Sequence, residues 1–120
     1  NAIYYNVLCQ CGGKMKEKEI AQKVLEIFGK QKVELRIGLQ LAEEGYGFYV
    51  EELVNGKYKR TPNAKKIEED EELLDMLCSV VEERFHIFKR GLTWEDVDWA
   101  YITITHEKII AHLELHGDGK

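Results

Sequence analysis

Residues 97–116 constrain the fold more than any other stretch, because they show the alternation of two β-strands joined by a short connection at residues 106–108. One face of this predicted hairpin is aliphatic and suited to a core: Ala100, Ile102, Ile104, Ile109, Ala111, Leu113 and Leu115. The opposite face carries aromatic, hydroxyl, imidazole and carboxylate groups: Trp99, Tyr101, Thr103, Ile110, His112, Glu114 and His116. That mixture suits contact with another molecule.

Residues 32–61 predict three further strands. The first, over residues 32–41, alternates like a half-buried antiparallel strand, with these side chains expected inward: Val33, Leu35, Ile37, Leu39 and Leu41. After a turn at residues 42–45, a strand over residues 46–54 is expected to point Tyr46, Phe48 and Val50 inward and Tyr49, Glu51 and Leu53 outward. Asn55-Gly56 then favours a type I′ turn, which needs positive φ at both central residues, so a short strand over residues 57–61 should pair back.

Two amphipathic helices are expected to cover the aliphatic faces. Residues 16–28 carry apolar side chains at helical spacing, and Gly29 supplies a left-handed stop. A long helix is expected from Ile67 or Asp70 to about Arg90, with residues 63–66 as a connection before it. The acidic run at residues 68–72 would then lie in its first turns, where the helix dipole favours carboxylates. Residues 93–96 have the spacing of another short helix start.

These patterns predict an α+β fold in the order α-β-β-β-α-β-β, an antiparallel sheet of about four or five strands with two helices on one face. One domain is assigned to residues 15–116, and residues 117–120 to a flexible tail. Asn1-Ala2 is interpreted as a purification-tag remnant, and residues 3–14 either as a translated leader before a native start at Met15 or as an extra strand. No apolar run approaches the roughly 20 residues of a membrane helix.

Charge and cysteine content narrow the functional class. The net charge of −5 disfavours nucleic acid as a ligand, since phosphate binding needs a basic surface. It suits a basic partner, although mild acidity is also common among cytoplasmic proteins without such a partner. The three cysteines, Cys9, Cys11 and Cys78, form no disulfide framework and are typical of a cytoplasmic protein. Cys9 and Cys11 lack the second ligand cluster that a structural zinc site needs, so no cofactor is expected.

No catalytic motif of high specificity occurs in the chain, which favours binding over enzymatic activity. His112, Glu114 and His116 are suitable residue types for zinc or non-haem iron. Along a strand, however, they would be spaced roughly 6.5–7 Å apart, and three in line do not converge on one ion without bending. A small metal-dependent enzyme that uses these three residues remains the alternative.

Two surfaces are predicted to bind a partner. Six residues would share the outer face of the sheet, beside Glu34, Arg36 and Thr103, if both hairpins join one sheet with the helices behind it: Tyr49, Glu51, Trp99, Tyr101, His112 and Glu114. Their composition is typical of interface cores, which favour aromatic residues. The second surface is the acidic helix start, represented by Glu68, Glu69 and Asp70, which could dock a basic protein.

The order of helix, β-meander, long helix and Trp-led hairpin over about residues 16–115 resembles the YezG-like immunity proteins, which neutralise bacterial polymorphic toxins. The residues that match most closely are Gly47-Phe48-Tyr49-Val50, and Trp94 ahead of the strand over residues 101–105. The resemblance implies a non-catalytic bacterial protein of the cytoplasm that binds a cognate toxin domain, often a basic nuclease, and blocks its active site. A phage or mobile-element inhibitor of a host defence protein is a second binding hypothesis.

Overall fold

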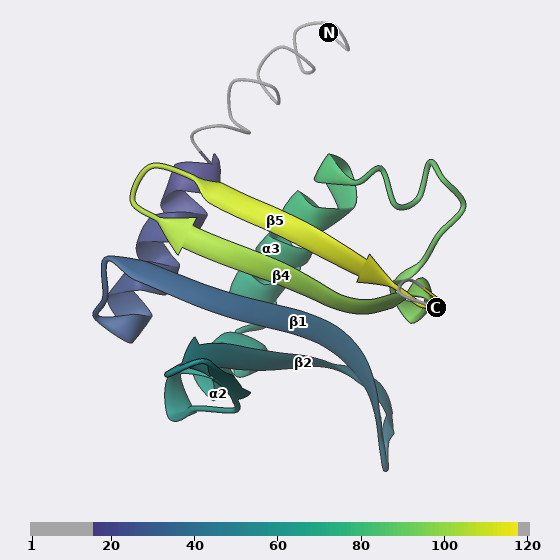
Figure 1. Cartoon of the computed structure of the whole chain (residues 1–120), viewed down its shortest axis with the longest axis horizontal. Coiled ribbons are helices and arrows are strands. Elements are labelled where there is room, and N and C mark those ends of the chain that lie inside the picture. Colours follow the sequence, from purple (N-terminus) through teal and green to yellow (C-terminus); the bar gives the residue numbers. More distant parts are fainter. Residues whose placement is uncertain (1–15, 118–120) are drawn as a thin grey trace, which may run out of the picture.

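The computed structural model describes residues 16–117, so the interpretations of residues 1–14 and of residues 118–120 lie outside it. Five strands form one antiparallel sheet in the order β3-β2-β1-β4-β5 (Figure 1). They are β1 (Lys32–Ala42), β2 (Gly45–Val54), β3 (Lys57–Lys59), β4 (Val97–Thr105) and β5 (Ile109–Leu115). Pairing of β1 with β4, from Lys32–Thr105 to Ile37–Ala100, joins the two predicted hairpins.

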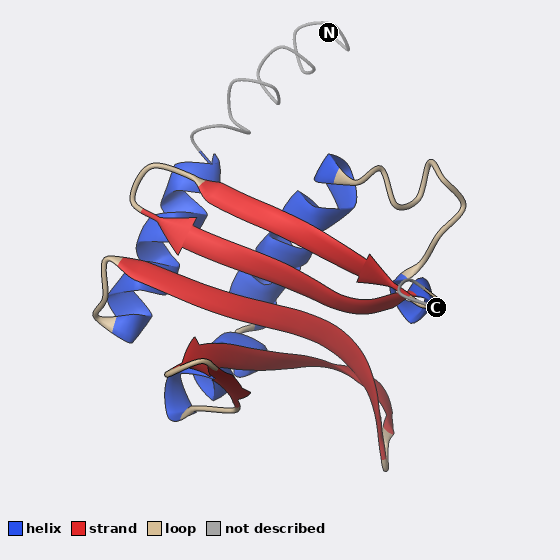
Figure 2. Ribbon diagram, in the orientation of Figure 1, coloured by secondary structure: helices blue, strands red, loops and turns tan. Residues whose placement is uncertain are grey.

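The helices lie on one side of this sheet (Figure 2). They are a helix whose described part covers residues 16–28, α2 (Pro62–Glu69) and α3 (Glu71–Arg84), with a short 3₁₀ helix, η1 (Trp94–Asp96), before β4. The α+β class is therefore confirmed. Two turn predictions are confirmed as well, because Gly29 has φ 62°, and Asn55 and Gly56 have φ 52° and 80°. Within the described range, no helix is long and apolar enough to cross a bilayer.

The prediction of one long helix from about residue 67 to Arg90 is wrong, because two shorter helices occupy this part of the chain. Thr61 starts α2 five residues earlier than expected: its Oγ1 accepts a hydrogen bond from Ala64 N at 3.1 Å, and Pro62 takes the first helical turn. At the other end α3 stops at Arg84, and His86, with φ 50°, begins the departure from helical geometry that Gly91 completes.

The acidic run is consequently divided between two helices. Asp70 lies between them, and its side chain accepts a hydrogen bond from Leu73 N at 3.1 Å, which caps α3. Only the residues after Asp70 occupy the first turn of α3, where the dipole favours them. Glu68 and Glu69 end α2 instead, so the dipole argument is wrong for this half of the run.

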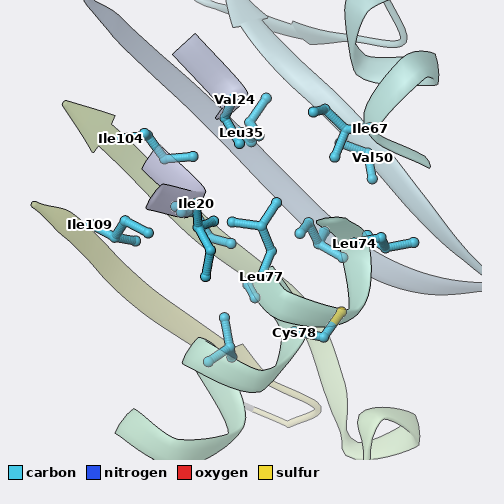
Figure 3. Packing of buried hydrophobic residues seen from close by; sticks show 14 of the residues in the cluster. Ile20, Val24, Leu35, Val50, Ile67, Leu74, Leu77, Cys78, Ile104 and Ile109 are labelled. Carbon is cyan, nitrogen blue, oxygen red and sulfur yellow. The ribbon is translucent and has the colours of Figure 1, made fainter. Parts of the chain in front are cut away.

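The core lies between the sheet and the helices (Figure 3). The N-terminal helix buries Ile20, Ala21, Val24, Leu25 and Phe28, and α3 buries Leu73, Leu74, Leu77, Cys78 and Val81. The inner face of the sheet buries Val33, Leu35, Ile37, Val50, Ala100, Ile102, Ile104 and Ile109, which confirms the predicted alternation at these positions. Each large aliphatic side chain contributes roughly 1.5–3 kcal/mol on full burial.

Two residues that were expected inward are exposed at the tip of the β1–β2 hairpin. Leu41 and Tyr46 pair across the hairpin and are 73% and 65% exposed. The strand alternation is correct for them, but the hairpin tip extends past the helices, so no second layer covers it (Figure 1).

Candidate functional site

The sheet face away from the helices carries an aromatic and charged group that we call the outer-face cluster: Arg36, Glu51, Tyr58, Trp99, Tyr101, His112 and Glu114. All five strands contribute to it, and the register brings its members together. Arg36 on β1 pairs with Glu51 on one side and Tyr101 on the other. On β4 and β5, Trp99 pairs with Glu114 and Tyr101 with His112. Side chains directly opposite each other on one face are close enough to interact.

Arg36 holds the centre of the outer-face cluster. Its guanidinium contacts Glu51 Oε1 through Nε at 2.7 Å and through Nη2 at 2.6 Å. Its Cζ also lies 4.0 Å from the Trp99 ring centre and 4.6 Å from the Tyr58 ring centre. A cation over an aromatic face is attracted by about 0.5–1 kcal/mol at an exposed site. One side chain on β1 therefore restrains groups on three other strands.

Tyr101 extends the cluster toward β5. Its ring centre lies 5.6 Å from that of Tyr58 and 5.9 Å from that of His112, and its hydroxyl donates a long hydrogen bond of 3.4 Å to Glu114 Oε2. Burial, with smaller contributions from Tyr101 and Glu34, raises the pKa of the Tyr58 phenol above 10.0. At neutral pH this phenol is therefore protonated and can donate a hydrogen bond to a partner.

The structure brings five of the predicted outer-face residues together: Glu51, Trp99, Tyr101, His112 and Glu114. Tyr49 is on the same face by alternation, but Arg60 lies over its ring with Cζ 4.5 Å from the ring centre. Sequence reasoning placed Arg36 on this face without giving it the central position, and it missed Tyr58; both residues hold the cluster together. The available signal was their outward position beside other aromatic residues, but the pairings that unite them are non-local.

The second predicted surface has a different character. Glu68 Oε1 accepts a hydrogen bond from Val50 N at 3.3 Å, and its other oxygen pairs with Arg60 at 2.5 Å. Asp70 is used as a helix cap. Of the three residues proposed there, Glu69 and Asp70 are exposed, and Glu68 is half-buried. Two of these carboxylates therefore already have structural partners, and the run is not part of the outer-face cluster.

The hairpin residues considered for metal binding each contact another side chain. His112 lies against Tyr101, Glu114 accepts from Tyr101, and His116 Nδ1 pairs with Asp98 Oδ1. Across residues 16–117, no three His, Cys, Asp or Glu side chains are grouped so that they could hold a metal ion. The three residues of the metal-dependent alternative do not form such a group. Cys78 is buried, which raises the pKa of its thiol to about 12, so it is a neutral group and a poor nucleophile at pH 7.

A cleft of about 520 Å³, which we call the end cleft, opens where β1 separates from β4. Pairing of β1 with β2 continues to Ala42–Gly45, whereas its pairing with β4 stops at Ile37–Ala100. Figure 1 shows β1 curving away from β4 at this end. The cleft is lined by residues that include Tyr46, Trp94, Glu95, Asp98, Trp99 and Glu114.

Gly38 sets the position of Trp99 between the outer-face cluster and the end cleft. A Cβ at Gly38 would lie 2.8 Å from the Asp98 carbonyl oxygen and 2.9 Å from Trp99 Cε3, closer than real Cβ atoms come. The indole can therefore lie against β1 only because residue 38 has no side chain. A glycine inside a strand often marks such a close approach.

Comparisons with protein-family models, with curated proteins and with solved structures find no match for this chain. Its function is therefore argued from the geometry of the outer-face cluster.

Proposed function

We propose that this protein is a non-catalytic immunity protein that binds a cognate bacterial toxin domain and occludes its active site. The observation that carries the proposal is the outer-face cluster, which the helices leave uncovered. Tyr, Trp and Arg are the residue types that contribute most to binding energy at protein interfaces, and the cluster combines all three. The resemblance to YezG-like immunity proteins supports the same function.

The outer-face cluster is also restrained before binding. The Arg36–Glu51 ion pair and the ring contacts of Arg36 limit the rotamers of Trp99 and Tyr58. Side chains that are already ordered lose less entropy in a complex, so more of their contact energy is available for affinity.

Charge indicates the kind of partner. The outer face carries both signs of charge: Glu34, Glu51 and Glu114 share it with Arg36 and with Lys32 at the start of β1, and Arg60 lies over the Tyr49 ring. The whole chain has a net charge of −5. A basic toxin domain such as a nuclease would be attracted to a protein of this net charge over long range, which raises the association rate. We place the encounter in the bacterial cytoplasm, where such a toxin would act on its producer.

Co-expression with the product of the gene immediately upstream tests the proposal. The expected result is a complex stable in size-exclusion chromatography, together with rescue of growth when that product is toxic. If neither complex nor rescue is found, the proposal is wrong.

Three variants locate the binding surface. Tyr101→Ala should weaken the complex by roughly 2 kcal/mol or more, about thirtyfold, because an aromatic group is lost from the centre of the face. Phe88→Ala is the matched control, since Phe88 is 61% exposed and follows α3 in the helical layer. Equal affinity of both variants would rule out the outer face. Loss of binding in Glu69→Lys with no change in Tyr101→Ala would assign binding to the acidic run instead.

A further inference from the structure

We propose that the end cleft receives a Lys or Arg side chain of the partner protein. This rests on the proposed function for the identity of the partner, but the cation-binding property of the cleft belongs to this chain and can be measured without the partner.

The shape of the end cleft comes from the way the sheet splits. Beyond Ile37, β1 keeps β2 as its neighbour but loses β4, so a wedge opens between the hairpin and the start of β4. Trp94 forms a fixed wall: it is 7% exposed, its ring lies 5.2 Å from that of Phe48, and its Nε1 donates to Glu82 at 2.8 Å. A volume of about 520 Å³ is within the range of ligand-binding pockets.

The charge in the end cleft is one-sided. Among the described residues, its lining includes the carboxylates of Glu95, Asp98 and Glu114 and no Lys or Arg. His116 pairs with Asp98, and the one hydrogen bond that Glu114 accepts from the described residues is the 3.4 Å contact from Tyr101. Glu95 is exposed, and its carboxylate has no ion-pair partner in the described part of the chain. A cation placed here would offset negative charge that the described residues leave uncompensated.

Arg36 does not already supply that cation. Its guanidinium lies over the Trp99 ring at 4.0 Å, but its charge is paired with Glu51 at 2.6 Å on the far side of β1 from β4. The contact nevertheless shows that a guanidinium fits against the indole that separates the outer-face cluster from the end cleft.

The lining also favours a long cationic side chain over a bare ion. The carboxylates do not form a group that could hold a metal. They alternate with apolar surface from Leu39, Tyr46 and Trp99, which suits the methylene stem of Lys or Arg below its charged end. Because Trp99 and Glu114 belong to both the outer-face cluster and the end cleft, a protein seated on the cluster would reach the cleft with a neighbouring side chain.

A titration with the tripeptide acetyl-Gly-Arg-Gly-amide tests the cleft on the isolated protein. The control peptide replaces Arg with citrulline, which has nearly the same shape and no charge. Two-dimensional NMR should show saturable shifts, in the millimolar range, at the amides of Glu95 and Asp98 and at the indole resonance of Trp99. The citrulline peptide should bind at least about fivefold more weakly. Equal binding of both peptides, or the absence of saturable shifts at these residues, would overturn the inference.

Charge variants then check the carboxylates. Glu95→Gln should weaken binding of the Arg peptide about threefold, and adding Glu114→Gln about tenfold in total, as expected for exposed ion pairs. Glu107→Gln is the matched control, because Glu107 is an exposed carboxylate in the β4–β5 turn at the other end of the sheet. If Glu107→Gln weakens binding as much as Glu95→Gln, the peptide is responding to overall charge and the inference is wrong.

The outcomes separate this inference from the proposed function. Binding of the Arg peptide without any toxin complex would leave the cation site in place and remove the immunity function. The opposite result is a toxin complex that the Glu95→Gln/Glu114→Gln variant forms as tightly as wild type, together with no binding of the Arg peptide to the wild-type protein. That result would remove the cation site and leave the immunity function in place.

Discussion

Replacing Gly38 with alanine is expected to displace Trp99 and to destabilise the fold. The new Cβ would lie 2.8 Å from the Asp98 carbonyl oxygen and 2.9 Å from Trp99 Cε3, so either the backbone of β4 or the indole must move. Gly47→Ala is a matched control. Gly47 is also a strand glycine without positive φ, and a Cβ there meets nothing within 4 Å.

The magnitude follows from two opposing contributions. An extra methyl group in a tight site typically costs 1–3 kcal/mol, since neighbouring groups leave their preferred geometry. Replacing glycine by alanine also stiffens the unfolded chain, which returns about 0.4–1 kcal/mol. The second contribution is shared by Gly38→Ala and Gly47→Ala. The difference between their free energies of unfolding should therefore be about 1–3 kcal/mol, with Gly38→Ala the less stable.

Urea denaturation followed by circular dichroism measures that difference, and near-ultraviolet circular dichroism reports the displacement of the indole. The chain contains two tryptophans, so the Trp99 indole resonance can be assigned and followed separately by NMR. Agreement of the two unfolding free energies within about 0.5 kcal/mol, with an unchanged Trp99 resonance, would refute the close approach of Trp99 to β1.

Three further predictions concern buried and capping groups. Glu52 is 3% exposed and accepts from Lys30 Nζ at 2.5 Å and Thr61 Oγ1 at 2.8 Å, so Glu52→Gln should cost about 1.5–3 kcal/mol in urea denaturation; an unchanged midpoint would contradict this. Asp70→Ala removes the cap of α3 and should lower the free energy of unfolding by about 1 kcal/mol in the same assay. Asp70→Asn should keep most of the capping stabilisation, because the amide oxygen of asparagine can accept the same hydrogen bond. Burial raises the pKa of the Cys78 thiol from 9.0 to about 12, so the unfolded state loses this proton first. Wild type should therefore lose stability relative to Cys78→Ala as pH rises from 9 toward 12, by about 1.4 kcal/mol per pH unit, and parallel pH profiles of the two proteins would exclude this linkage.

The strand faces and turns were predictable because their signals are local. Alternation assigns a residue to a face without knowledge of the neighbouring strand, and Asn55-Gly56 and Gly29 provide the positive φ that their turns require. The division between α2 and α3 was harder to predict. Asp70 caps α3 from within a run of like residues, so nothing local distinguishes it from a residue of the first helical turn. Pro62 is compatible with a strand exit and with a helix start, and the structure uses it for the start.

The candidate site was predictable only in part, since its members meet through pairings between distant segments. Alternation placed Trp99, Tyr101 and Glu114 outward, but the central position of Arg36 depends on β1 pairing with both β2 and β4. Glu52 was hard to predict for another reason, because its residue type suggests exposure although the side chain is buried. A carboxylate usually marks a solvent-facing position, yet this one faces inward, because Lys30 and Thr61 satisfy its oxygens in the fold.

The end cleft was not predictable from alternation. The apolar pattern of β1 continues through Leu41, although the pairing of β1 with β4 stops at Ile37. The signal that was available is Gly38, which interrupts the outward side chains of β1 where Trp99 crosses it. Because Trp99 belongs to both the outer-face cluster and the end cleft, the two sites should respond together when it moves. Gly38→Ala is therefore expected to weaken both the toxin complex and the binding of the Arg peptide, while Gly47→Ala leaves both unchanged. Loss of one without the other would mean that the two sites act independently.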